Sequence, residues 1–220
     1  MGTATVASMA SHEARRIVDE LQAARVDPST VADDAIADSR FRLRTGRLTL
    51  RRWTDADRAA FHALNCDLEV MATIGPLMDR TTSDAFLDFI EAHFDRHGYG
   101  LFCVDLDGES IGFTGLLHPG WRDGVEIGWR IRSDHWGNGY APEAARAVLD
   151  LAFGQLGLDE LISFTARTNT KSRRVMEKIG LLHAPDDDFE HPNLPANSPL
   201  RPHVFYRLSA AQFRAAVGDD

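Results

Sequence analysis

Apolar and polar residues along this chain recur with two different periods, one typical of strands and one of helices. Leu48 and Leu50 alternate with polar neighbours, as in a half-buried strand. Two longer apolar runs are joined by Asp107-Gly108, a dipeptide typical of a tight hairpin turn. Taken along the whole chain, this pattern predicts strands near residues 48–50, 99–106, 110–117, 125–131, 161–166, 181–183 and 204–208.

Helical spacing of apolar residues appears between these strands. Thr54 is placed to cap a helix that runs to Asn65, and Asp57 suits the positive end of that helix. A second helix is expected over residues 83–97, where phenylalanines recur on one face. A third helix follows residue 140. A fourth helix, over residues 171–179, is expected to end with Gly180 at its C′ position.

The order of these elements predicts an α/β (α+β) layered domain over residues 41–212. Residues 1–40 are expected to form an added N-terminal helical extension, because apolar residues such as Ile17 and Leu21 line one side of a helix. Such a stripe needs a partner surface. We therefore expect the extension to dock on the domain or to pair subunits in a homodimer. Residues 213–220 are interpreted as a C-terminal tail.

A glycine loop that leads into a helix is the most informative motif, and it reads Trp136-Gly137-Asn138-Gly139-Tyr140-Ala141-Pro142-Glu143. Two glycines two positions apart let the backbone turn tightly and bring its N–H groups close to a ligand. Pro142 suits the first turn of a helix, and Glu143 suits its positive end. Because a helix N-terminus attracts anions, the motif is either a pyrophosphate cradle or an ordinary strand-to-helix turn.

The surroundings of the loop favour phosphate binding. A predicted strand, Val125–Ile131, precedes it, and Ala144, Ala145 and Val148 follow it at helical spacing. Two other nucleotide motifs are excluded. The loop lacks the Gly-Lys-Ser/Thr ending of a P-loop, and it lacks the third glycine and following acidic residue of a dinucleotide fingerprint. We therefore do not expect an ATPase or a dehydrogenase.

These residues resemble the GNAT superfamily of N-acetyltransferases, in the branch similar to ribosomal-protein N-terminal acetyltransferases. The resemblance covers roughly Arg42 to Leu208 and rests on blocks that stand in the family's order. The blocks are Glu126–Trp129, Trp136–Ala141, Glu143-Ala144, Asn169 with Ser172, and Glu177–Leu181.

The resemblance implies the GNAT fold, with a mixed central sheet of about seven strands flanked by helices. It also implies acetyl-CoA as the co-substrate and no metal, with the fourth strand's backbone holding the pantetheine arm. The positions expected to bind the cofactor are Trp129, Ile131, Trp136, Gly137, Asn138, Gly139, Tyr140, Ala141, Asn169, Ser172 and Arg173.

Glu126 is the candidate general base. Strand alternation places Glu126, Gly128 and Arg130 on one face, and the small Gly128 leaves space beside the carboxylate for an amine or a relaying water. The alternative is a structural glutamate paired with Arg130. A base is needed less if the acceptor is an α-amine, whose pKa of roughly 7.7–8.0 leaves an appreciable neutral fraction.

The proton donor cannot be the residue that many GNAT members use, because Met176 stands where they have a tyrosine. Ser172 is the candidate acid, since it occupies the Asn-x-x-Ser position that lies near the thiol in this branch. The alternative is that Ser172 only satisfies backbone groups in the first helical turn. Further basic candidates for contact with the cofactor's phosphates are Arg132, Lys171, Arg174 and Lys178.

Composition narrows the function classes. A formal charge of −9 argues against a nucleic-acid binder and is compatible with a cationic amine acceptor. Cys66 and Cys103 form no metal-site or disulfide spacing. His93 and His97 are interpreted as marking an exposed helix end and not a metal site. Because the chain has no apolar stretch of transmembrane length and no signal-like start, we expect a cytoplasmic protein without a membrane partner.

Two functions follow from these observations. The first is an acetyl-CoA-dependent N-acetyltransferase, in which a primary amine of a protein N-terminus or a small molecule attacks the thioester directly. The second is a noncatalytic acyl-CoA-binding or regulatory module with the GNAT fold. The missing tyrosine favours the second function, whereas Glu126, Asn169 and Ser172 oppose it.

Overall fold

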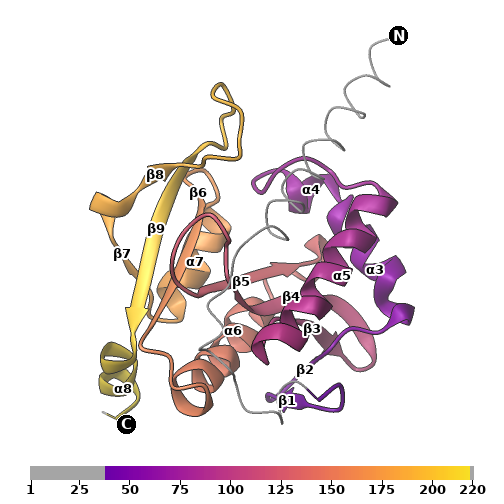
Figure 1. Cartoon of the computed structure of the whole chain (residues 1–220), viewed down its shortest axis with the longest axis horizontal. Coiled ribbons are helices and arrows are strands. Elements are labelled where there is room, and N and C mark those ends of the chain that lie inside the picture. The colour runs from indigo at the N-terminus through magenta and orange to yellow at the C-terminus, as the bar shows by residue number, and fades with distance from the viewer. Residues whose placement is uncertain (1–37, 219–220) are drawn as a thin grey trace.

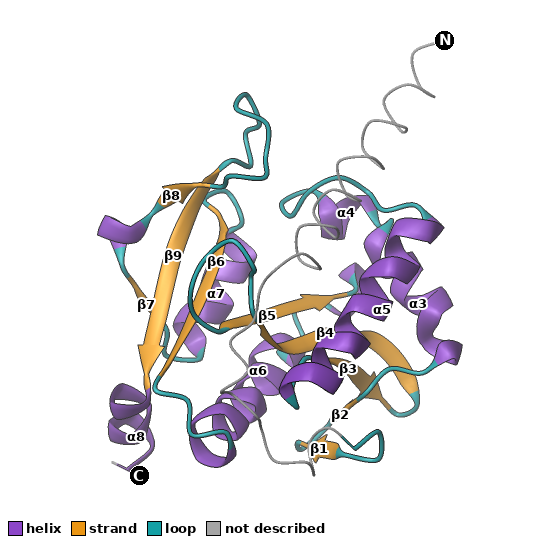
Figure 2. Ribbon diagram, viewed as in Figure 1, coloured by secondary structure: helices purple, strands orange, loops and turns teal. Residues whose placement is uncertain are grey.

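The computed structural model describes residues 38–218, which form a mixed nine-stranded sheet flanked by helices (Figures 1 and 2). The strand order across the sheet is β1-β2-β3-β4-β5-β6-β9-β7, and β8 pairs with β9. The strands are β1 (Arg42–Arg44), β2 (Thr49–Arg51), β3 (Leu101–Leu106), β4 (Glu109–Leu117), β5 (Glu126–Ile131), β6 (Glu160–Ala166), β7 (Leu182–His183), β8 (Phe189–Glu190) and β9 (Pro202–Ser209).

Helices cover both faces of the sheet (Figure 2). None of those in the described part of the chain is both long and apolar enough to cross a membrane. The α-helices are α3 (Arg58–Asn65), α4 (Leu68–Met71), α5 (Arg80–His97), α6 (Tyr140–Asp150), α7 (Thr170–Lys178) and α8 (Ala210–Gly218). The 3-10 segments are η1 (Asp55–Asp57), η2 (Ser133–His135) and η4 (Pro185–Asp187), and a π-helical segment, η3 (Leu151–Gln155), extends α6.

Strands β5 and β6 separate in the middle of the sheet. They pair in parallel, and they share one paired position, Glu126 with Ile162. By contrast, the whole length of β5 pairs with β4, and β6 pairs with β9 from Glu160 to Ala166. Figure 1 shows β5 and β6 running in different directions. The separation leaves one edge of β5 without a strand partner beyond Glu126.

The two faces of the sheet serve different helices. Phe113 on β4 pairs with Arg130 on β5, so the two side chains share a face. The Phe113 ring lies 6.1 Å from that of Phe61 in α3 and 6.3 Å from that of Phe86 in α5. The helices α3 and α5 therefore cover the face that carries Arg130. The alternate residues of β5 point to the other face, where α6 packs against β4 and β5.

The predicted fold class is confirmed, and each predicted strand is present. The hairpin turn has positive φ at Asp107 and Gly108, and Gly180 follows α7 with a φ of 89°. The sequence pattern missed β1, β8 and α4, which have three, two and four residues and are too short to show a period.

Of the two predicted chain ends, the structure describes the C-terminal one to residue 218 and the N-terminal one only from residue 38. The described part of the expected C-terminal tail, to residue 218, belongs to α8, whose Phe213 ring lies 5.0 Å from that of Phe153. The N-terminal helix predicted around Ile17 and Leu21, with its docking or pairing role, lies outside the described residues.

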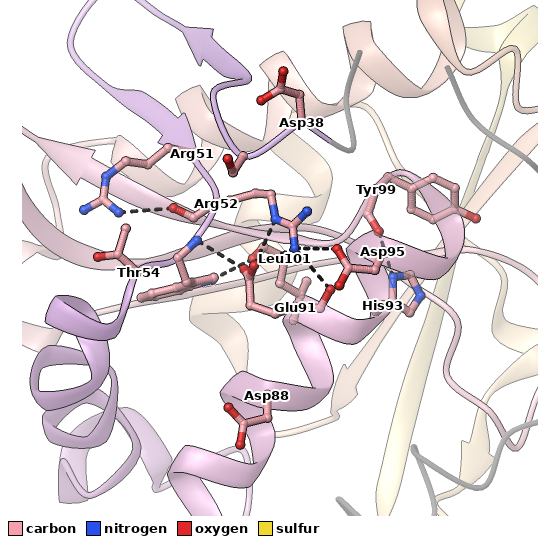
Figure 3. A network of polar contacts seen from close by, with 12 residues as sticks. Asp38, Arg51, Arg52, Thr54, Asp88, Glu91, His93, Asp95, Tyr99 and Leu101 are labelled. Carbon is pink, nitrogen blue, oxygen red and sulfur yellow. Dashed lines mark hydrogen bonds and ion pairs between the residues drawn. The ribbon is translucent and has the colours of Figure 1, made fainter. Parts of the chain in front are cut away.

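A polar network ties the first strands to α5 (Figure 3). The guanidinium of Arg52 lies 2.7 Å from Glu91 Oε2 and 2.8 Å from Asp95 Oδ1. The next residue, Trp53, donates its indole N–H to the Leu101 carbonyl at 2.8 Å. Because a buried cation is costly without a partner, this pairing fixes the position of α5 over the sheet.

The prediction of an exposed end for α5 is wrong, because His93 and His97 are 5% and 2% exposed. Their rings lie 4.3 Å apart, and the His97 ring lies 4.7 Å from that of His118. His93 Nδ1 lies 2.8 Å from the Tyr99 carbonyl, and the backbone N–H of His118 donates to His93 Nε2. These contacts hold the His93 ring neutral, with its proton on Nδ1.

This histidine cluster is expected to make the fold sensitive to acid. Burial lowers the pKa of His93 from 6.5 to about 3 and that of His97 to about 4. Below pH 6.5 these two histidines therefore bind protons in the unfolded chain but stay neutral in the folded chain. The free energy of unfolding should fall as the pH drops from 7 toward 4. At pH 5 the fall relative to pH 7 should be about 2 kcal/mol per histidine. Urea unfolding across this range measures the fall.

A matched pair of variants tests the assignment. His97→Gln should lose about one histidine's share of the pH dependence, whereas His135→Gln, outside the cluster, should keep the wild-type dependence. An unchanged slope in His97→Gln would contradict the assignment.

Candidate functional site

The predicted glycine loop forms the N-terminal end of α6. Gly137 and Gly139 both have a φ of 81°, a left-handed conformation that other residues rarely adopt. Glu143 donates its backbone N–H to the Gly139 carbonyl. Among the described residues, the N–H groups of residues 137–141 have no protein acceptor. The loop therefore presents a row of free donors at the positive end of a helix, which is suited to an anionic ligand.

Arg47, from the turn between β1 and β2, braces this loop. Its Nη1 donates to the Asn138 carbonyl at 3.0 Å, and its Nε donates to Glu143 Oε2 at 2.7 Å. Its guanidinium also lies 4.6 Å from the centre of the Tyr140 ring. Arg47 was not predicted as a site residue, because it stands about ninety positions before the loop and has no local motif.

The free edge of β5 lies beside the loop. Arg132 donates its backbone N–H to Ile111 of β4, so alternation turns the N–H groups of Trp129 and Ile131 away from β4 and toward β6. Beyond Glu126, β6 no longer pairs with β5. Two backbone donors therefore face the gap between the strands. The Ile131 carbonyl accepts from the Trp136 indole at 2.7 Å, which fixes the strand to the start of the loop.

One cavity of about 650 Å³ extends from the loop, along the gap between β5 and β6, to the face of the sheet that carries Arg130. Most of the predicted site residues line it, and its other walls come from the segment after α4 and from the segment before β9. The predicted residues among its lining are Glu126, Trp129, Ile131, Trp136, Gly137, Gly139, Tyr140, Ala141, Asn169 and Ser172, and residues not predicted for the site include Phe86, Phe113, Phe164 and Thr165.

Glu126 lies half-buried in this cavity. A Cβ atom placed on Gly128 would meet one atom within 4.0 Å, Glu126 Oε1, so the expected free space beside the carboxylate exists. No described residue forms an ion pair with Glu126, and the alternative of a structural pair with Arg130 is therefore wrong. Loss of hydration raises the pKa of Glu126 from 4.5 to about 8.

Asn169 and Ser172 stand at the start of α7. Asn169 caps the helix, because its Oδ1 accepts from the Ser172 N–H at 3.1 Å and its Nδ2 donates to Thr165 Oγ1 at 3.0 Å. The Ser172 hydroxyl has no hydrogen-bond partner among residues 38–218. The alternative, in which this hydroxyl hydrogen-bonds the helix backbone, is therefore wrong. Met176, at the usual tyrosine position, is 1% exposed.

Two predicted cofactor residues do not line the cavity. Arg173 turns toward the Tyr206 hydroxyl, at 3.5 Å from its Nε, because α7 places that side chain on its sheet-facing side. Asn138 donates its side-chain amide N–H groups to the His135 and Trp136 carbonyls. Of the further basic candidates, Arg132 pairs with Glu109 and Asp134, whereas Lys171, Arg174 and Lys178 line the cavity.

These features fit acetyl-CoA. The free N–H groups of the loop suit a pyrophosphate, the nearby basic side chains suit further phosphates, and the β5 donors suit the amide groups of pantetheine. Within residues 38–218, no three histidine, cysteine, aspartate or glutamate side chains are grouped to hold a metal ion.

Comparisons with known proteins identify the same family that the sequence motifs resemble. Residues 47–182 match the family described as the acetyltransferase (GNAT) domain. FsC-acetyl coenzyme A-N(2)-transacetylase of Aspergillus fumigatus is 32% identical over 153 residues, which cover 64% of this chain and 65% of that protein.

Solved structures share the fold. The acetyltransferase from Agrobacterium tumefaciens is 32% identical with a TM-score of 0.66, over 78% of this chain and 95% of that one. Mycobacterium smegmatis RimJ, solved with CoA-disulfide, is 24% identical with a TM-score of 0.61, over 81% of this chain and 93% of that one, and this likeness concerns the fold alone.

Proposed function

Because this chain belongs to the GNAT family of acetyltransferases, we propose that it transfers the acetyl group of acetyl-CoA to a primary amine that attacks the thioester directly. Membership makes it an acetyl-CoA-dependent N-acetyltransferase. The amine class and the roles of individual residues are our proposal. The acceptor is a protein N-terminus or a small molecule.

The observation that carries the proposal is the continuity of one cavity from the loop to Glu126. At one end, the N–H groups of Gly137–Ala141 hold the pyrophosphate. In the middle, the N–H groups of Trp129 and Ile131 bind the pantetheine arm and polarise the thioester carbonyl. At the other end, the Glu126 carboxylate, with Gly128 beside it, accepts the proton of the attacking amine.

The proton balance needs a donor for the departing sulfur. Ser172 is our candidate for this role, because the residue lines the cavity and its hydroxyl has no protein partner among the described residues. An ordinary serine is a weak acid, so its role is to hydrogen-bond the departing sulfur and to relay to it a proton taken from solvent water. Lys171, Arg174 and Lys178 replace Arg173 as the basic residues of α7 that face the phosphates.

A thiol-release assay tests the function. The protein is mixed with acetyl-CoA and a panel of amines and peptides, and free CoA is measured over time with heat-denatured protein as the control. Release that depends on one class of amine is the expected result. Tight CoA binding with no release for any amine would instead support the noncatalytic module, which the buried Met176 favours.

A further inference from the structure

Arg130 is a buried cation with an unsatisfied donor. Its side chain extends from β5 and is 9% exposed, and it lines the cavity on the face covered by α3 and α5. Its Nη1 donates to Asn65 Oδ1, and its guanidinium lies 5.1 Å from the centre of the Phe113 ring. Its Nε is buried and has no hydrogen-bond partner in the described part of the chain.

Two other arginines with little exposure, the half-buried Arg51 and the buried Arg52, are paired with carboxylates. Arg51 lies 2.8 Å from Asp57 and 2.9 Å from Asp105. Arg52 lies between Glu91 and Asp95. Within the described range, 38–218, no carboxylate forms an ion pair with Arg130. Since the neutral amide of Asn65 and a phenyl ring do not balance its charge, the site lacks a negative group.

The surroundings of Arg130 show where that group would come from. Its strand neighbour on the same face, beyond Gly128, is Glu126. The two positions are four steps apart along the strand, so their Cα atoms lie about 13 Å apart. The cavity wall on this side is apolar, with Met71, Phe86 and Phe113. A ligand with an amine at Glu126 would therefore extend along apolar side chains toward the guanidinium.

We propose that Arg130 binds a carboxylate carried by the acceptor, several bonds away from the amine that is acetylated. The planar guanidinium suits this role, because it can donate two parallel hydrogen bonds to a carboxylate. The acceptor is then an amine with an apolar middle and an anionic end. This inference rests on the proposed function, since it takes the acceptor amine to lie at Glu126.

Equilibrium binding tests the proposal without turnover. Calorimetry with the CoA-saturated protein compares ω-amino acids, from γ-aminobutyrate to ω-aminooctanoate, with the n-alkylamine of the same carbon number. The carboxylate form of at least one length should bind at least tenfold more tightly. The preferred length measures the distance between the amine and the carboxylate sites.

Variants assign this preference to Arg130. In Arg130→Gln the preference should disappear while the alkylamine binds as before, and Arg130→Lys should keep part of it. Arg58→Gln, at an arginine paired with Asp55 and Asp88 on the surface, is the matched control and should keep the full preference.

Two results would overturn the proposal. One is equal binding of the two series by the wild-type protein, which needs no variant and so does not depend on the folding of Arg130→Gln. The other is an equal loss for both series in Arg130→Gln, which would make the residue structural. The thiol-release assay stands apart from both, because a failure there contradicts the proposed function and leaves the binding comparison valid.

Discussion

Replacing Glu126 by glutamine is expected to lower the maximal rate of acetyl transfer by about 10²–10⁴-fold. Glutamine has nearly the same shape but cannot accept the proton of the amine. The affinity for CoA should stay nearly unchanged, because the loop at the start of α6 and the β5 backbone do not depend on this carboxylate. Steady-state rates with the preferred acceptor, together with calorimetry for CoA, measure the two effects separately.

The pH dependence gives this prediction a second readout. With a pKa of about 8, Glu126 becomes a base only as the pH rises through that value. The maximal rate of the wild-type protein should therefore increase from pH 6.5 to 9, and Glu126→Gln should lack this increase. The midpoint should also stay in place when the acceptor is exchanged for an amine of different pKa.

Glu160→Gln, at an exposed glutamate on β6, is the control and should keep the wild-type profile. A wild-type rate in Glu126→Gln would leave the carboxylate without a role in proton transfer. The amine would then attack in its neutral form unaided, as an α-amine is able to do.

Replacing Gly139 by valine is expected to weaken CoA binding by about 10- to 100-fold, or roughly 1.4–2.7 kcal/mol. The φ of 81° at this position is costly for a β-branched residue. The loop will relax away from the geometry in which its N–H groups converge on the phosphates. Calorimetric titration with CoA measures the loss, and circular dichroism verifies that the variant is folded.

Gly157 provides a matched control for this substitution. It also has a positive φ, 63°, and it does not line the cavity. Gly157→Val should therefore lower stability through similar backbone strain while it leaves CoA affinity unchanged. If folded Gly139→Val bound CoA as tightly as the wild type, the loop would be an ordinary strand-to-helix turn.

Local sequence was sufficient to predict most of the elements and the phosphate loop. The paired glycines at 137 and 139, Pro142 and Glu143 act through backbone conformation and the helix terminus, which depend on adjacent residues. The turn at Asp107-Gly108 and the helix end at Gly180 were predictable for the same reason. These features need no knowledge of what packs against them.

Pairing across the chain was not predictable in this way. Whether Glu126 and Arg130 form an ion pair depends on side-chain direction and on what each helix offers, and α3 offers Asn65 to Arg130. The direction of Arg173 depends likewise on Tyr206 from β9. A one-dimensional pattern places such residues on the right element but does not say which partner each one meets.

The sequence alone determined the order of strands and helices, the glycine loop and the set of residues on each face of β5, because these follow from nearest-neighbour geometry and strand period. Only the tertiary structure decided the separation of β5 from β6, the bracing of the loop by Arg47, the burial of the histidine cluster and the unpaired charge of Arg130. Each of these depends on groups far apart in the chain. Their contacts form only when the sheet and its helices pack together, and burial then sets the cost of every charge left without a partner.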